Sequence, residues 1–384
     1  MLSKSVRLKG FKKKISSKKI KTIYKKLLNS KSEVLNSLSL NYHYSFNKKK
    51  LSKYKKNKYF RVIGMGGSTL GSQAIYDFLK HRIKKNFLFI DNLKLSQKNA
   101  KKNFTNLVIS KSGNTIETIV NANILIKNKD KNIFITEDKN SYLKLLANKL
   151  KAEIIDHNNF IGGRYSVLSE VGMLPAELMG LDSNKFKQIN SLIKNKQFEN
   201  SLLSNVAASL YYLKKKKFNS IIINYDEKSE NLFKWYQQLV AESLGKKNKG
   251  ILPIVSIMPR DNHSVMQLYL DGFKHNFFTF FYVKEKNSDR LFNNNILSAK
   301  NYLKNKDVNK IIYAQKKATE NVFKKKNIPF RSFELDNRDE KSLGELFCFF
   351  ILETILIGRA LKIDPYNQPA VELIKKETKK LLVS

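Results

Sequence analysis

Cysteine is almost absent from the sequence, with Cys348 the only one in 384 residues. A single cysteine excludes an intramolecular disulfide and is typical of a reducing compartment, so the sequence predicts a cytoplasmic location. Long uncharged apolar runs are absent too, because none reaches the roughly 18 residues that a membrane-spanning helix needs. The sequence therefore predicts no membrane association. Its hydrophobic content of 42%, with 11% aromatic residues, predicts a folded, globular chain.

Acidic residues are scarce relative to basic ones. Lys and Arg number 73 against 32 Asp and Glu, which gives a formal net charge of +41. Such an excess raises the question of a nucleic-acid partner. However, lysine is spread through every segment together with asparagine, no known DNA- or RNA-binding motif interrupts it, and arginine is infrequent. We therefore interpret the charge as surface lysine with no specific nucleic-acid partner, although it would speed the encounter with anionic metabolites.

From residue 59 onward, short apolar strands alternate with helical segments, which is the pattern of a doubly wound parallel sheet. The first group of predicted strands covers 59–66, 86–91, 106–112, 132–136 and 152–156. The second group covers 220–225, 254–259, 277–283, 310–314 and 330–335. The predicted fold class is thus α/β with two doubly wound parallel sheets and helical N- and C-terminal extensions, and the two groups indicate a duplicated architecture.

The same patterns predict a division of the chain into five segments. These are a basic N-terminal extension (1–55), a first α/β domain (56–183), a helical bridge (184–214), a second α/β domain (215–362) and a C-terminal helix (363–384). A long helix is expected over about 342–362. The chain-breaking "DPYNQP" separates it from a final helix over 369–382.

The first candidate site is "GMGGSTLG", residues 64–71, where a strand ends in glycines and a helix begins. Backbone N–H groups at such a turn bind anions. The Gly-Lys-Ser/Thr of a P-loop is missing, and a dinucleotide site would want glycine where the chain has Thr69, although Asp91 keeps that alternative open. A phosphorylated small molecule needs only the glycines, among them Gly67, and the hydroxyl of Ser68.

A second strand–turn–helix segment, "ISKSGNTIET" at 109–118, is dense in hydroxyls. Ser110, Ser112 and Thr115 together with backbone amides could form a phosphate cradle, with Lys111 as a nearby cation. The simpler interpretation is a capping box, in which Ser112 or Asn114 caps the helix and Glu117 reaches back, and such a cap is compatible with the cradle. Two serine-bearing glycine turns in one α/β unit favour a phosphate monoester over a dinucleotide.

An acid stands where helical spacing places the border of an apolar stripe. In "WYQQLVAESLGKKNKG", residues 235–250, Glu242 lies seven residues after Trp235 and one turn after Gln238. Burial would penalise its charged form. Partial burial raises the basicity of a carboxylate, so Glu242 is a candidate for a chemical role.

Three further residues are candidates on their local context. Arg164 follows two glycines in "GGRYSVLSEVGMLPAEL", where a guanidinium could stabilise an anion or merely lie at the surface. His263 precedes a predicted helix in "RDNHSVMQLYLDG", although a lone histidine is more often structural. Lys375 lies on the predicted C-terminal helix, and its immediate sequence does not distinguish it from other lysines.

Taken together and in this order, six motifs resemble the glucose-6-phosphate isomerase (phosphoglucose isomerase) family. They are "GMGGSTLG", "SKSGNTIET", "GGRYSVLSEVG", "QQLVAESLGK", "HSVMQLYLDG" and "DPYNQPAVELIK", which span residues 61–376 with the strand before the first. The resemblance implies two sugar-isomerase (SIS) domains, a homodimer, and interconversion of glucose 6-phosphate and fructose 6-phosphate through a cis-enediol. It implies neither a cofactor nor a metal.

The resemblance also implies a role for each matching residue. Glu242 would shuttle a proton between C2 and C1, Gln238 would contact substrate, and Arg164 would stabilise the enediolate. His263, supplied by the partner subunit, would serve ring opening, and Lys375 would assist at the ring oxygen. The 6-phosphate would be held by Gly67, Ser68, Ser110, Lys111, Ser112 and Thr115.

Two alternatives to this function stay open at the level of sequence. A non-catalytic phosphosugar-binding protein needs only the phosphate cradle, so the presence of Glu242, Arg164, His263 and Lys375 together speaks against it. An isomerase of another hexose phosphate would differ in pocket shape, which the sequence does not show.

Overall fold

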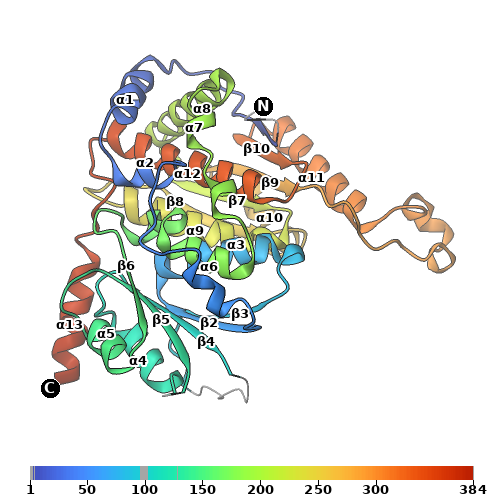
Figure 1. The fold of residues 1–384 in the computed structure, drawn as a ribbon. Coiled ribbons are helices and arrows are strands. Elements are labelled where there is room, and N and C mark those ends of the chain that lie inside the picture. Colours follow the sequence, from blue (N-terminus) through green and yellow to red (C-terminus); the bar gives the residue numbers. More distant parts are fainter. Residues whose placement is uncertain (1–2, 4, 96–102, 128, 384) are drawn as a thin grey trace.

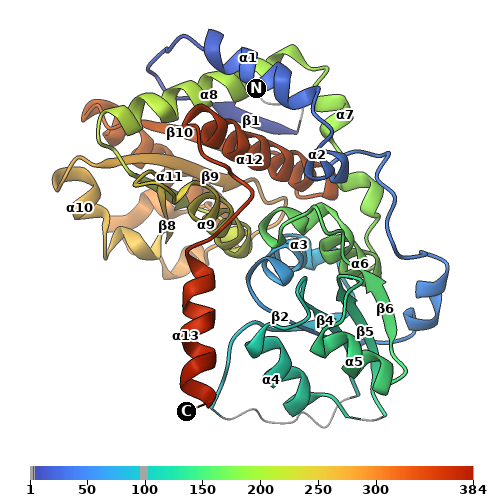
Figure 2. The ribbon, with the colours of Figure 1, turned by 90° about the vertical axis from the view of Figure 1, so that its left-hand side faces the viewer.

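The computed structural model describes residues 3, 5–95, 103–127 and 129–383. It contains two five-stranded sheets flanked by helices, one built mainly from each half of the chain (Figures 1 and 2). The predicted α/β class with two wound sheets is therefore confirmed. No helix among the described residues is long and apolar enough to cross a membrane.

The first sheet is entirely parallel and has the strand order β3-β2-β4-β5-β6. The chain starts near the middle with β2, adds β3 on one side, and then crosses back to add the other three. Ligands of such sheets bind at the carboxyl ends of the strands where the winding reverses, here between β2 and β4. The strands are β2 (Tyr59–Gly64), β3 (Asn86–Ile90), β4 (Thr105–Ile109), β5 (Lys131–Thr136) and β6 (Glu153–Asp156).

The second sheet repeats this winding in the order β1-β10-β9-β7-β8. The first strand of this half, β7, again lies between the second and the third, so the predicted duplication of architecture is present. The central strand β9 is buried along its whole length, as its run of phenylalanines predicts. The strands are β7 (Asn219–Asn224), β8 (Leu252–Ile257), β9 (Asn276–Val283), β10 (Phe330–Leu335) and the edge strand β1 (Val6–Lys9).

Two helices in equivalent positions join the halves. Helix α3 (Leu70–Phe78) follows β2, helix α9 (Glu230–Leu244) follows β7, and the two pack against each other. Helix α12 (Glu340–Ala360), buried from Ser342 to Gly358, packs against α9 and against α8 (Lys196–Lys214). The first helix of each unit thus lies at the interface between the two sheets, which brings their strand ends toward a common region.

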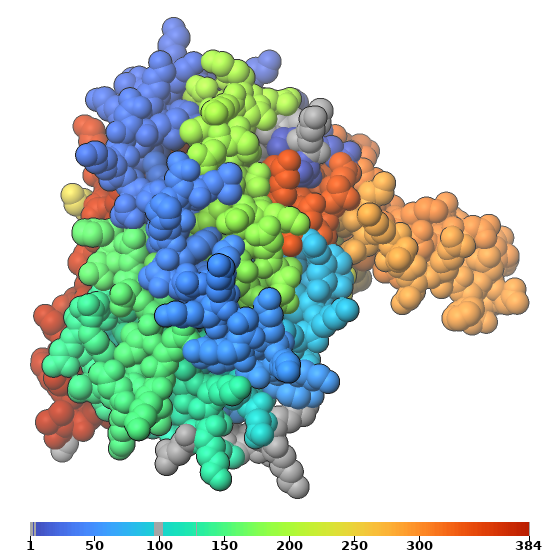
Figure 3. Space-filling model, viewed as in Figure 1, coloured from blue at the N-terminus to red at the C-terminus, as the bar shows by residue number. Residues whose placement is uncertain are grey.

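The remaining helices surround this core. They are α1 (Lys18–Leu28), α2 (Glu33–Ser37), α4 (Ile116–Leu125), α5 (Tyr142–Lys149), α6 (Glu170–Met179), α7 (Ile189–Leu192), α10 (Met266–Asp271), α11 (Val308–Lys325) and α13 (Val371–Val383). The N-terminal extension is docked, because α1 packs on α8 and α12. Figure 3 shows an arm, residues 285–307, which projects from the body of the molecule.

One local expectation was wrong, and two others are refined by the structure. Residues 310–314 are not a strand but lie in α11, because Ile312, Lys316, Glu320 and Phe323 form one helical face and Asp307 caps the helix start. The second sheet is not purely parallel, since β1 pairs antiparallel with β10. The helix expected near His263 begins only at Met266, after a short 3-10 turn, η7 (Arg260–Asn262).

Candidate active site

Four segments that are distant in the sequence converge beside α9. They are the glycine turn after β2, residues 162–164 at the start of η4 (Gly163–Leu168), α9 itself, and the segment 364–368 before α13. A Cβ at Gly67 would lie 2.1 Å from the backbone carbon of Gly163, and one at Gly66 would lie 2.9 Å from Nε2 of Gln238. The backbone of the turn therefore lies directly against the segment that carries Arg164.

Arg164 is the centre of this convergence. Its side chain is 1% exposed. Each of its five N–H groups has an acceptor, namely Ser243 Oγ (2.8 Å), Glu242 Oε1 (3.0 Å), Gln368 Oε1 (2.8 Å) and the carbonyls of Pro365 (2.8 Å) and Asn367 (3.2 Å). A guanidinium with all donors engaged is fixed in position, so the interpretation of Arg164 as a surface arginine is excluded.

Glu242 faces this arginine from α9. Its Oε1 accepts a hydrogen bond from Arg164 Nη1, and its Oε2 accepts one of 2.9 Å from Nε2 of Gln238, one turn earlier. The side chain is 23% exposed, so the carboxylate is neither buried nor free. The acid at the border of the apolar stripe thus has two partners that orient it and a side open to solvent.

Buried side chains hold the arginine segment in place. The indole Nε1 of Trp235 donates to the backbone carbonyl of Arg164 (3.1 Å). The hydroxyl of Tyr165 lies 2.9 Å from Ser243 Oγ and donates to the carbonyl of Pro365 (3.1 Å). Burial raises the pKa of Tyr165 to about 12, so the phenol stays neutral and acts as a donor at physiological pH.

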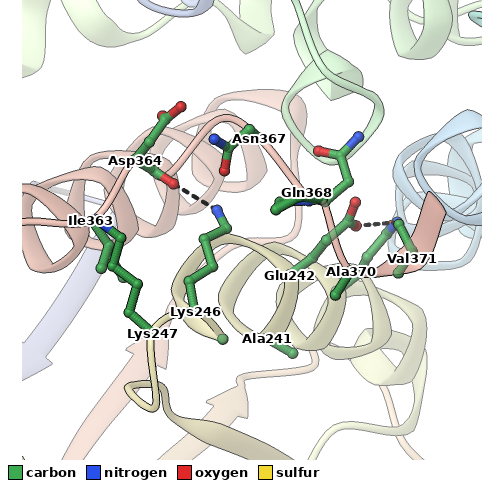
Figure 4. A pocket seen from close by; sticks show the side chains of 13 residues that line it. Ala241, Glu242, Lys246, Lys247, Ile363, Asp364, Asn367, Gln368, Ala370 and Val371 are labelled. Atoms are coloured by element: carbon green, nitrogen blue, oxygen red, sulfur yellow. Dashed lines mark hydrogen bonds between the residues drawn. The ribbon is translucent and has the colours of Figure 1, made fainter. Parts of the chain in front are cut away.

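A pocket of about 740 Å³ opens at Glu242, between α9 and the segment that leads into α13. Figure 4 shows Glu242 and Gln368 side by side there, with Lys246 reaching toward Asp364. Lys246 Nζ donates to the carbonyls of Ser243 (2.9 Å) and Asp364 (2.6 Å). Burial and, secondly, the charge of Arg164 lower the pKa of Lys246. A small polar molecule in this pocket would contact the carboxylate of Glu242.

The predicted phosphate cradle lies at the winding reversal of the first sheet. Gly64 and Ile109 pair in register, so the turns that follow β2 and β4 are neighbours. The hydroxyls of Ser110 and Thr115 are 3.0 Å apart, and Thr115 stands at the N-cap of α4 without making a side-chain cap bond. Its hydroxyl therefore lies in the turn after β4, beside that of Ser110.

Three other residues of the predicted cradle have distinct surroundings. Ser112 accepts a hydrogen bond from the backbone N–H of Asn114 (3.2 Å). Lys111 donates to the carbonyl of Asn159 (2.8 Å) and lies 3.6 Å from Glu137. Ser68 ends the short turn η2 (Gly66–Ser68), half-buried. None of the three lines the pocket at Glu242, so the cradle and this pocket are distinct features.

The structure does not bring His263 and Lys375 to the arginine centre. His263 is exposed in the turn after β8, and it is not among the residues that line the pocket. Lys375 is one turn beyond Val371, which does line the pocket, but α13 has no buried residue and Lys375 pairs with Glu372 at 2.6 Å. The roles expected for both stay predictions.

Sequence reasoning missed two contributors to the site. Ser243 and Gln368 both accept hydrogen bonds from Arg164, yet neither was singled out. Ser243 directly follows Glu242, and Gln368 lies in "DPYNQP", so their position within the matching motifs was the available signal. Within the described part of the chain, no group of three or more His, Cys, Asp or Glu residues is placed to hold a metal ion.

Comparison with known structures shows the same fold. A hypothetical protein from Thermus thermophilus superposes with a TM-score of 0.83 at 21% identity, over 95% of each chain. A glucose-6-phosphate isomerase from Chlamydia trachomatis superposes with a TM-score of 0.71 at 17% identity, over 91% of this chain and 78% of the other. At these identities the similarity establishes the two-sheet fold alone.

Comparison of sequences is more specific. The glucose-6-phosphate isomerase of Methanocaldococcus jannaschii is 35% identical over 348 residues, 85% of each chain. That of Mycoplasmopsis pulmonis is 34% identical over 350 residues, 84% of this chain and 82% of the relative. A family model described as phosphoglucose isomerase matches residues 49–384 and thus leaves out most of the N-terminal extension. By both the family match and its relatives, the chain belongs to the phosphoglucose isomerase family.

Proposed function

We propose that this chain is an aldose–ketose isomerase that interconverts glucose 6-phosphate and fructose 6-phosphate through a cis-enediol intermediate. The carrying observation is the contact between Glu242 and Arg164 at the pocket, where a half-buried carboxylate meets a guanidinium fixed by five hydrogen bonds. Membership of the phosphoglucose isomerase family supports the same reaction. Such a step belongs to glycolysis and gluconeogenesis.

Glu242 is the proposed base. In the open-chain aldose it would take the proton from C2, and the electron pair would shift to form the enediolate. Return of the proton to C1, together with transfer of the hydroxyl proton from O2 to O1, would give the ketose. Its two oxygens already have one donor each, Arg164 and Gln238, which hold the carboxylate in one orientation while its exposed side faces the pocket. General bases act from such fixed positions within hydrogen-bond reach of the carbon acid.

Arg164 is proposed to stabilise the negative charge that develops on the substrate oxygens. Because all five of its donors are engaged, substrate must replace one acceptor, and the side-chain oxygen of Gln368 is the candidate. Gln368 lies at the pocket on a segment that leads into an exposed helix, whereas the other acceptors are backbone carbonyls or residues of α9. A guanidinium that is already in position before the reaction lowers the barrier, because it does not have to reorganise as the negative charge develops.

The 6-phosphate is proposed to bind at the turns after β2 and β4. Their backbone N–H groups, the hydroxyls of Ser68, Ser110, Ser112 and Thr115, the close-packed Gly67 and the cation Lys111 are the contributing groups. Their location at the winding reversal of a doubly wound sheet supports this role, since anions bind there in many α/β folds. Gln238, which contacts both Gly66 and Glu242, would bridge the phosphate and the reacting carbons.

His263 and Lys375 are proposed to act during ring opening, with His263 supplied by the partner of a homodimer. The exposure of His263 supports an intermolecular role. The projecting arm carries strongly exposed apolar side chains at Phe292, Leu297 and Tyr302, which a second subunit could cover. Lys375 would reach the ring oxygen from α13 across the turn that separates it from Val371. We also expect a cytoplasmic location, consistent with a lone, buried Cys348.

The test is conversion of fructose 6-phosphate by the purified chain, with the glucose 6-phosphate formed measured by a coupled dehydrogenase. Mannose 6-phosphate and glucosamine 6-phosphate are assayed in parallel to define specificity. We expect turnover of fructose 6-phosphate well above that of the other two. Saturable binding of fructose 6-phosphate without turnover would contradict the proposal and favour a phosphosugar-binding protein. Preferred turnover of another hexose phosphate would change the substrate assignment.

A further inference from the structure

A second pocket, of about 990 Å³, is larger than the one at Glu242 and shares no residue with it. Three segments form it, namely the chain that leaves β1, the end of α8 with the residues after it, and the connection from α11 to β10. We call it the lysine groove, after the lysines in its wall: Lys9, residues 12–14, Lys215, Lys217 and Lys324.

The groove is far more basic than the composition of the chain requires. Seven of its fourteen lining residues are lysines and none is acidic. In the whole chain, 73 of 384 residues are Lys or Arg, which is about one in five. The pocket at Glu242 provides an internal reference, because its two lysines, Lys246 and Lys247, are balanced by Glu242 and Asp364. The two pockets therefore differ in charge balance as well as in size.

The lysines of the groove lack an ion-pair partner in the part of the chain that the structure describes. Among the described residues, none of the seven lysines forms an ion pair. Glu320 lies close enough to act on Lys9, but it is already engaged by Lys316 at 2.8 Å and by Lys317 at 3.5 Å. Burial and the neighbouring ammonium of Lys324 lower the pKa of Lys9. The fold thus holds like charges together, and an anion would relieve their repulsion.

The framework beneath these lysines is ordered. Strand β1 is fixed by its pairing with β10, with Lys9 opposite Ser332, so the chain enters the groove at a defined point. Tyr212 is 6% exposed, and its ring lies 5.1 Å from that of Phe11, which anchors the next part of the wall. The ammonium of Lys13 lies 5.9 Å from the ring of Tyr211. The lysines of the groove therefore project from a wall whose backbone is held by packed aromatic side chains.

The number and type of cations define the class of ligand. Lysine binds phosphate as a point charge, whereas arginine offers a bidentate fork to carboxylates and phosphates alike, and no arginine lines the groove. The groove therefore suits an anion that is recognised by its charge. A phosphate monoester carries a charge of about −1.5 to −2 at neutral pH. Seven lysines with no acid in the wall exceed that charge several-fold, so several linked phosphates match the groove better than one. The volume also lies in the range of about 300–1,000 Å³ typical of small-molecule sites.

We propose that the lysine groove binds a small anion with several linked phosphate groups, either inorganic triphosphate or the triphosphate chain of a nucleotide. The site is separate from the proposed isomerase site. Lys9 and residues 12–14 belong to the N-terminal extension, which precedes the segment matched by the family model. Binding therefore depends on a part of this chain that lies outside its family match.

The proposal is tested by isothermal titration of the full chain with sodium triphosphate and, separately, with ATP, without added magnesium, at 50 and 200 mM NaCl. The groove variant combines Lys12→Gln, Lys13→Gln and Lys14→Gln, all exposed positions. The control variant combines Lys19→Gln, Lys25→Gln and Lys26→Gln on α1, which are also exposed and remove the same charge outside the groove.

We expect saturable binding by the wild type, weakened at least tenfold in the groove variant and less than twofold in the control, with isomerase activity unchanged in both. Equal affinity for the two probes would identify the phosphate chain as the recognised element, and tighter binding of ATP would add a contribution from the nucleoside. Equal losses in both variants, or no saturable binding at 50 mM NaCl, would overturn the proposal. Tighter, groove-dependent binding of a twelve-nucleotide RNA would overturn it in favour of nucleic acid.

Discussion

The arginine centre and the lysine groove surround positive charge in opposite ways within one molecule. The side chain of Arg164 is 1% exposed, and its five N–H groups donate hydrogen bonds to five acceptors, including the carboxylate of Glu242. The groove gathers seven lysines without an acid in its wall. In a chain with a formal charge of +41, the number of cations therefore says little about chemistry. What distinguishes a fixed, buried cation from an exposed cation without an acidic partner is the set of groups around it.

The difference has a physical consequence. A buried guanidinium with all of its hydrogen bonds formed is preorganised, and salt screens it weakly. Exposed lysine side chains attract an anion mainly through their charge, and salt weakens this attraction by screening it. We therefore expect reactions at Glu242 to depend on individual hydrogen bonds, and binding in the groove to depend on total charge. The groove variants described above test the second half of this comparison. Three substitutions test the proposed isomerase site, and a fourth tests a buried cation of a third kind.

The largest effect is expected for Glu242→Gln. The amide keeps the shape of the side chain and can still contact Arg164 and Gln238, but it cannot accept the C2 proton. We expect isomerase turnover to fall by about 10²–10⁴ while fructose 6-phosphate still binds. Glu230→Gln, on the exposed side of the same helix, is the matched control and should retain full activity. Unchanged turnover of the Glu242 variant would remove this residue from the mechanism.

Arg164→Lys tests whether the geometry of the donors matters beyond their charge. Lysine keeps the positive charge but offers one nitrogen in place of the guanidinium fork, so contacts to Ser243 and the 365–367 carbonyls are lost. We expect a decrease in kcat of about 10²–10³, comparable to loss of a donor that stabilises a developing anion. Arg7→Lys, at an exposed ion pair, should change neither kcat nor melting temperature measurably. Equal kcat values for wild type and Arg164→Lys would show that charge suffices.

An intermediate effect is expected at the cradle. Ser110→Ala removes one hydroxyl that would bond a charged phosphate, a loss of about 1.5–3 kcal/mol. We expect KM for fructose 6-phosphate to rise by roughly ten- to a hundredfold, with a smaller change in kcat. The exposed Ser204→Ala is the control. A fall in kcat at constant KM would contradict a role in phosphate binding.

Lys187 provides a third kind of cation, buried without a carboxylate partner within bonding distance in the described structure. Its ammonium bonds to the carbonyls of Ser37 and Leu168 and lies 4.8 Å from the rings of both Tyr42 and Tyr44. These contacts favour the charged form, and Glu170 and Cys348 add to them, whereas burial and the charge of Lys48 oppose it. Burial is the largest influence, and it lowers the pKa of Lys187 to about 7.

The smallest effect follows from this shift. Between about pH 7 and the ordinary lysine pKa, the unfolded chain binds one more proton at Lys187 than the folded chain does. The free energy of unfolding should therefore rise with pH, by up to about 1.4 kcal/mol per unit, and stay level below pH 7. Urea unfolding at pH 7, 8 and 9 should show this slope in the wild type and in the exposed control Lys185→Met. The same slope in Lys187→Met would disprove its origin in Lys187.

Local sequence patterns correctly predicted those elements whose own residues form a clear apolar run or a clear apolar stripe. The strands around β2, β4, β7 and β9 are buried apolar runs, and α9 has an apolar stripe that made Glu242 conspicuous. The prediction of a strand over 310–314 was wrong because a short apolar run fits a strand and a helix equally well. Strand β1 escaped notice because its four residues become a strand only by pairing with β10, more than 300 residues away.

The site shows the same division. Residue type and position made Glu242 and Arg164 candidates, whereas the carbonyls of Pro365 and Asn367 are backbone groups that residue type cannot predict. Their role depends on how the segment before α13 lies across Arg164, which only the tertiary structure determines. The lysine groove could not be predicted from the sequence for a related reason. Its lysines come from three separate segments, each of which resembles ordinary surface sequence.

The most direct test of the central claim, proton transfer by Glu242, is isomerisation of fructose 6-phosphate in D₂O followed by NMR of the product. A carboxylate that carries the proton exchanges it with solvent during some turnovers, so the wild type should introduce deuterium at C2 of glucose 6-phosphate. Incorporation should fall in Glu242→Gln to the same extent as turnover. Rapid conversion by the wild type without any deuterium in the product would contradict proton transfer through an enediol at Glu242.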